Sequence, residues 1–163
     1  MTVALSFPAC GPAPLDDLEL VAEIEAFEAA IAGQPREVVQ RLLRDQTSTF
    51  KGRLVTVSSA IVSSTYFRDN RSNIYFGTNY DESDHLFLSE IDPPLHDALK
   101  DHRHWVSVAA THPTRQLSFE MPIDQPTFDR LERGQEVAFS CTIAAMIRGK
   151  SVYCVPVVLD AGP

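Results

Sequence analysis

The chain has 163 residues and a net charge of −8, with 44% apolar and 22% charged residues. This length fits one ordinary domain, and the composition excludes a wholly disordered chain, a collagen-like chain and a disulfide scaffold. No uncharged apolar run approaches the roughly 20 residues that a membrane-spanning helix needs. The three cysteines include no CxxC pair. This odd number argues against a thiolate zinc cluster, and we expect reduced cysteines.

An irregular arm and a helical pair are predicted at the start of the chain. Residues 1–14 contain three prolines, and residues 15–49 carry helical periodicity. Asp16 and Glu19 have the spacing of a capping box, and Pro35 suits the first turn of a second helix. The apolar positions of the first helix form one stripe: Leu20, Ile24, Phe27 and Ile31.

From residue 50 to residue 160 the pattern changes to short strands. Residues rich in β-branched and aromatic side chains predict strands at 54–62, 74–76, 105–108, 116–119, 137–143 and 153–159. A brief helix, capped by Asp124 or Thr127, is expected to end near Leu131. The segments 105–108 and 116–119 count as one or two strands, and about five short strands with a helix before the last two are typical of a small Greek-key barrel of the OB type.

The last two strands predict a hairpin with a three-residue loop at 147–149. In that register Cys141 faces Val155, and Cys154 faces Thr142 on the other side of the sheet. We therefore expect Cys141 and Cys154 not to be bonded to each other. The core-facing residues of the second strand would be Tyr153, Val155, Val157 and Leu159.

Three short segments, 50–57, 131–137 and 149–154, resemble the OB-fold domains called tRNA-anticodon-binding-like. The resemblance extends in order over about residues 38–159. The chain departs from the family pattern in an acidic insertion at 79–103, and in having Ser58-Ser59-Ala60 in place of a glycine. The resemblance implies an α+β fold, a helical pair followed by a small OB-like Greek-key β-barrel, more than it implies an activity.

Aromatic and basic residues gather within residues 66–76, after the first predicted barrel strand, and this segment overlaps a net basic block at 36–71. The predicted ligand-binding residues there are Tyr66, Phe67, Arg68, Arg71 and Tyr75. Aromatic rings stack on bases and arginines contact phosphates, so this mixture is typical of single-stranded nucleic-acid binding. The alternative is that the aromatics fill the barrel while the arginines decorate a turn.

The acidic insertion is a second candidate surface, because residues 72–101 have a net charge of −6. A loop this long in a compact domain is more often functional or disordered than idle. The predicted partner-binding residues are Asp81, Glu82, Asp84, Phe87 and Glu90. They would dock another protein, and a basic one would compensate their charge. The alternative is a solvated loop.

The sequence contains no GxSxG motif and no glycine-rich phosphate loop, so we expect neither an enzyme nor a cofactor. His102 and His104 have a spacing that can bind a metal in an extended chain, but we expect no metal site. The predicted function is a non-enzymatic module that docks a macromolecular partner, as bacterial inhibitor, immunity or accessory proteins do. The alternative is single-stranded nucleic-acid binding through the first barrel loop.

We expect a cytoplasmic protein, because the first basic residue is Arg36 and a secretory signal needs a basic start. The alternative is a lipoprotein anchored at Cys10. Residues 5–11 resemble the end of a lipoprotein signal, which would function if the true start lay upstream.

Overall fold

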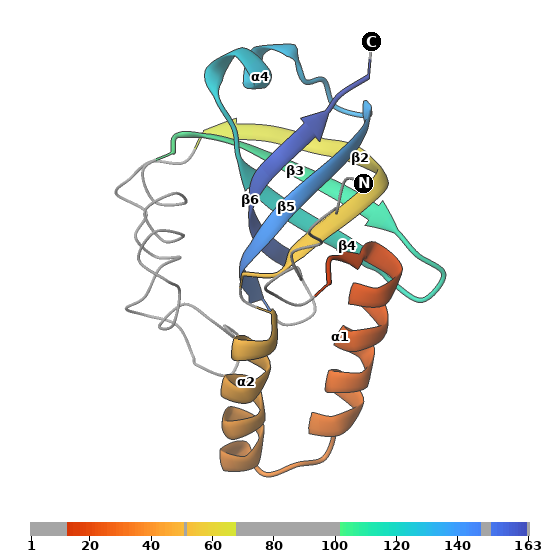
Figure 1. The fold of residues 1–163 in the computed structure, drawn as a ribbon, viewed down its shortest axis with the longest axis vertical. Helices are drawn as coiled ribbons and strands as arrows, with labels where there is room; N and C mark the ends of the chain where they lie inside the picture. Colours follow the sequence, from red (N-terminus) through yellow and green to blue (C-terminus); the bar gives the residue numbers. More distant parts are fainter. Residues whose placement is uncertain (1–12, 51, 68–101, 148–150, 163) are drawn as a thin grey trace, which may run out of the picture.

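A computed structural model describes residues 13–50, 52–67, 102–147 and 151–162. Five of its strands close a barrel, as Figure 1 shows. These strands are β2 (Leu54–Phe67), β3 (His104–Thr111), β4 (Gln116–Pro122), β5 (Glu136–Ile147) and β6 (Ser151–Asp160). They follow the order β2-β3-β4-β6-β5, and β5 pairs back with β2. The predicted α+β domain with a small barrel is confirmed at this level.

The barrel is mixed because β4 and β6 run parallel, whereas its other neighbouring strands are antiparallel. Within the barrel, the 14-residue strand β2 pairs with two strands. Its first half pairs with β5, and its second half pairs with β3. Its register shifts between Val57 and Ala60 and again between Val62 and Ser64. Such bulges bend a strand and increase its twist, which lets one strand turn the corner of a small barrel.

Alternating apolar residues of the five strands fill the barrel, as the period of two along a strand requires. The rings of Phe119 and Phe139 meet edge to face there, with centroids 5.1 Å apart. Further buried residues of this core include Val55, Val57, Val62, Val106, Val108, Met121, Val137, Cys141, Ile143, Val152 and Cys154.

The helical pair consists of α1 (Asp17–Ile31) and α2 (Arg36–Phe50), preceded by the two-residue strand β1 (Leu15–Asp16) beside β2. The predicted capping box is confirmed: Glu19 N–H donates to the Asp16 carboxylate at 2.7 Å, and Asp16 N–H donates to the Glu19 carboxylate at 2.9 Å. The predicted stripe is buried, but its two halves pack differently. Leu20 and Ile24 join the barrel core, and Phe27 and Ile31 pack on Val39 and Leu42 of α2. The pair consequently extends away from one end of the barrel, as Figure 1 shows.

Acidic side chains of α1 fasten this helix to the barrel. Glu23 pairs with Arg53 at 3.1 Å and Glu28 with Arg115 at 2.8 Å. Asp17 lies 3.3 Å from Nε2 of the buried His112. These three acids therefore contact the barrel and do not form an isolated acidic surface.

The opposite end of the barrel carries α4 (Gln125–Arg130), between β4 and β5 (Figure 1). Of the two predicted capping residues, Asp124 is the cap, and its carboxylate accepts from the Thr127 backbone N–H at 2.8 Å. Hydrogen bonds from Thr127 lower the pKa of Asp124 below its usual value, with a smaller contribution from the charge of Arg130. Gly134, at φ 87°, provides the left-handed turn into β5.

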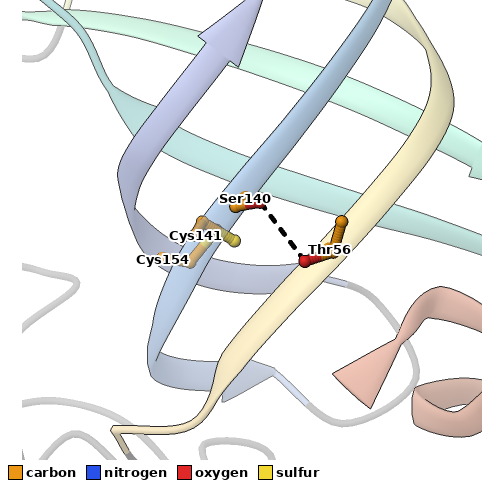
Figure 2. The surroundings of a disulfide bond; sticks show 4 residues. All are labelled: Thr56, Ser140, Cys141 and Cys154. Atoms are coloured by element: carbon orange, nitrogen blue, oxygen red, sulfur yellow. Dashed lines mark hydrogen bonds between the residues drawn. A yellow bond between two sulfur atoms is a disulfide. The ribbon is translucent and has the colours of Figure 1, made fainter. Parts of the chain in front are cut away.

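The predicted register of the last hairpin is wrong, and so is the prediction that its cysteines are unlinked. Cys141 pairs with Pro156 and Cys154 pairs with Ile143, because the register shifts between Ser140 and Cys141 and again after Ile143. A displacement by one residue moves Cys154 to the face that Cys141 occupies. The two cysteines form a disulfide, drawn in Figure 2, with a Cα–Cα distance of 5.6 Å.

The same displacement changes the core face of β6. Val152, Tyr153 and Cys154 are all buried, whereas Val157, expected in the core, is 63% exposed. Val155 and Leu159 are partly buried against the core.

Three of the predicted parts fall partly or wholly outside the described residues. These are most of the arm at 1–14, the short strand at 74–76 and nearly all of the acidic insertion at 79–103. No helix in the described ranges is long and apolar enough to span a membrane.

Candidate functional site

The two described members of the predicted ligand-binding set are the last residues of β2, Tyr66 and Phe67. Their side chains point to opposite faces of the strand, as those of successive residues in a strand do. The other predicted ligand-binding residues, Arg68, Arg71 and Tyr75, lie outside the described residues. So do all the predicted partner-binding residues, Asp81, Glu82, Asp84, Phe87 and Glu90.

Tyr66 belongs to a hydrogen-bonded network that spans three strands. Its hydroxyl donates to Oε2 of Glu120 on β4 at 2.6 Å, and the hydroxyl of Ser107 on β3 donates to Oε1 at 3.0 Å. The tyrosine ring also stacks on Trp105, with centroids 6.4 Å apart. Both the polar and the apolar part of Tyr66 are therefore engaged within the protein.

Trp105 extends this network toward β6. Its indole N–H donates to the carbonyl of His102 at 2.9 Å, and its ring meets Tyr153 edge to face at 6.3 Å. Trp105 is fully buried and Tyr153 is 6% exposed. Trp105 stacks on the partly buried Tyr66 ring and Glu120 accepts from its hydroxyl, so contacts within the barrel hold this side chain in place. The geometry favours a structural role for Tyr66.

Phe67 has the opposite character, because 70% of it is exposed. Its ring lies 5.2 Å from that of His104 on β3 and 4.9 Å from that of Phe128 on α4. His104 and Phe128 are themselves 5.0 Å apart, so the three rings contact one another. We call Phe67, His104 and Phe128 the Phe67 cluster.

Sequence reasoning identified Phe67 but missed its two neighbours. The spacing of His104 from His102 suggests only a metal ligand, and Phe128 falls within the predicted brief helix. Phe67 contacts His104 because the two residues pair in the β2–β3 register. Phe128 lies on α4, 61 residues after Phe67 in the chain. Only a correct β2–β3 register could have indicated the first contact.

The charges near the Phe67 cluster are mixed. Arg103 precedes His104 and is exposed, while α4 carries both Asp129 and Arg130 close to Phe128. In the part of the chain that the structure describes, no group of three or more His, Cys, Asp or Glu side chains is arranged to hold a metal. Among the described residues, no third ligand therefore joins His102 and His104, whose spacing could bind a metal in an extended chain.

A pocket of about 380 Å³ lies on α4 beside the end of β6. One of the residues that line it, Gln135, donates from its side-chain amide to the Ala161 carbonyl at 2.7 Å and accepts from the Glu132 N–H at 3.0 Å. The residues that line it are Thr127, Arg130, Leu131, Gln135, Leu159, Asp160, Ala161 and Gly162. None of the Phe67 cluster lines this pocket.

Comparisons of this chain with protein-family models, with curated proteins and with solved structures found no match.

Proposed function

We propose that this chain is a non-enzymatic binding module that docks a macromolecular partner through the Phe67 cluster. The observation that carries the proposal is the 70% exposure of Phe67 between two other rings. A large aromatic ring that is already held in place loses little conformational freedom on binding, and such rings often dominate the energy of an interface. The cluster thus has the properties of an anchor for a partner.

We further propose that the barrel is an OB-like Greek key. Its strand order, its parallel β4–β6 pair and the position of α4 between the third and fourth barrel strands support this assignment. In OB folds, the loop after the first barrel strand is part of the usual ligand face. Phe67 and His104 stand at the two ends of the segment that connects the first and second barrel strands.

We favour a protein as the partner. The net charge of −8 disfavours association with a polyanion, and Asp129 offsets one of the two arginines beside the cluster. The predicted partner-binding acids of the insertion would add attraction toward a basic protein. The alternative partner, single-stranded nucleic acid, is favoured by one observation: the exposed Phe67 ring contacts His104 and Phe128, which are close in sequence to Arg103 and Arg130.

The first experiment compares Phe67→Ser with the matched control Leu18→Ser, which alters a 61% exposed residue on α1. Each protein is used to capture partners from the native host, and bound protein and nucleic acid are both identified. For the partner retained by the wild type, we expect Phe67→Ser to weaken binding about tenfold or more, with no change for Leu18→Ser. Unchanged affinity of a folded Phe67→Ser protein would contradict the proposal.

A second variant separates the two kinds of partner. Replacing Asp81, Glu82 and Asp84 together by Asn, Gln and Asn should slow association with a basic protein, most clearly at low salt. The same variant should bind a single-stranded oligonucleotide equally well or better, because only repulsion is removed. Oligonucleotide binding that Phe67→Ser abolishes would favour the alternative function.

A further inference from the structure

Cys141 and Cys154 lie diagonally across the β5–β6 pair. Cys141 pairs with Pro156, which is two residues after Cys154. Cys154 pairs with Ile143, which is two residues after Cys141. Their Cα–Cα distance of 5.6 Å falls within the usual range for disulfides. Both cysteines come from one hairpin, with a sequence separation of 13. The pair can therefore meet as soon as this hairpin forms, before distant parts of the chain assemble.

Both cysteines are fully buried once the barrel is complete. β5 lies between β6 and β2, and Cys141 pairs with Val55 of β2 on the side away from β6 (Figure 2 shows Thr56 of β2 beside this hairpin). Val55 is itself fully buried. An enzyme that must touch the sulfur atoms has no access to them after β2 has closed the barrel.

We infer that a thiol–disulfide oxidase of an oxidising compartment forms the Cys141–Cys154 bond before the barrel closes. This inference is independent of the proposed function. It favours the exported alternative over the cytoplasmic location expected from the sequence, because disulfides in ordinary cytosolic proteins are rare.

The bond forms in two thiol–disulfide exchange steps. The thiolate of one cysteine attacks the disulfide of the oxidase, which forms a mixed disulfide and expels one oxidase thiolate. The thiolate of the second cysteine then attacks the first cysteine's sulfur, which closes the Cys141–Cys154 bond and releases the other oxidase sulfur. The chain loses two electrons and two protons, and the oxidase ends as a dithiol.

The first test is made on the full chain recovered from its native host with an alkylating agent and no reductant. Mass spectrometry of the peptides should show Cys141 joined to Cys154, and a Cys10→Ser variant should give the same cross-link. Recovery of Cys141 and Cys154 as two alkylated thiols would overturn the inference.

The second test addresses the order of events. Reduced chain is exposed to a purified thiol–disulfide oxidase either during refolding or after folding is complete. We expect oxidation to be about 100-fold slower or more for the folded chain, since the sulfurs must first be uncovered by unfolding. Equal rates would show that closure of the barrel does not protect the cysteines. If the reduced chain does not fold, the oxidised chain is challenged with a reductant with and without denaturant. The same protection is then expected against reduction.

Discussion

Nη2 of Arg115 donates hydrogen bonds to both carboxylate oxygens of Glu28, at 3.0 and 2.8 Å. Arg115 follows the turn after β3 and Glu28 lies on α1, so the contact joins segments 87 residues apart. Both side chains are partly buried, with exposures of 21% and 30%. The pair therefore fastens α1 to the barrel in a setting less screened than an open surface.

We expect Arg115→Ala to lower the free energy of unfolding by about 1 kcal/mol, because a charge-assisted contact and some side-chain packing are lost. Urea denaturation of Arg115→Ala, Glu28→Ala and the double variant would give the coupling energy. Glu37→Gln, an exposed acid in the first turn of α2, is the control and should change stability little. A coupling energy of zero would mean that the pair does not help to dock α1.

Two hydrophobic truncations in the last hairpin should differ in their effect. Phe139 is 3% exposed and packs on Phe119, so Phe139→Ala should destabilise the protein by about 3–5 kcal/mol through lost burial and a cavity. Val155 is only partly buried, so Val155→Ala should cost about 1 kcal/mol. Thermal or urea unfolding measures both, and equal losses would contradict the observed core face of β6.

Removal of the Tyr66 hydroxyl should destabilise the barrel without affecting partner binding. Tyr66→Phe takes away a donor from the Glu120 carboxylate and should cost about 1–2 kcal/mol. Ser107→Ala removes the second donor and provides a comparison at the same acceptor. If Tyr66→Phe instead weakened binding while leaving stability unchanged, Tyr66 would belong to the ligand face and not to the structural network.

The capping of α4 should weaken in acid. Because the pKa of Asp124 is lowered in the folded protein, its ionised form stabilises the fold above the ordinary value of 3.8. This contribution is lost as the pH falls below that value and through the lowered pKa. Hydrogen exchange of α4 amides between about pH 5 and about pH 2 should show the loss in the wild type. Asp124→Asn keeps a capping oxygen without the titration, so its α4 should show no such step.

Local features of this fold could be predicted from the sequence because a few neighbouring residues determine them. Asp16 and Glu19 specify a helix start through hydrogen bonds three residues apart, and Asp124 does the same for α4. The alternation of apolar residues along β2, β3 and β5 likewise indicated strands. These patterns predicted a small barrel with a helical pair, and Phe67 as one candidate contact residue.

The hairpin register and the aromatic cluster depended on tertiary structure. β6 carries apolar side chains at both odd and even positions, Val152, Tyr153, Cys154 and Val155, so its sequence allows either face to be the core. Register shifts in β5 and β6 selected the face that joins the two cysteines. The Phe67 cluster required β2, β3 and α4 to meet at one end of the barrel. Hydrophobic periodicity indicates which side chains of a strand can be buried. Strand register and long-range contacts depend instead on how the completed barrel packs.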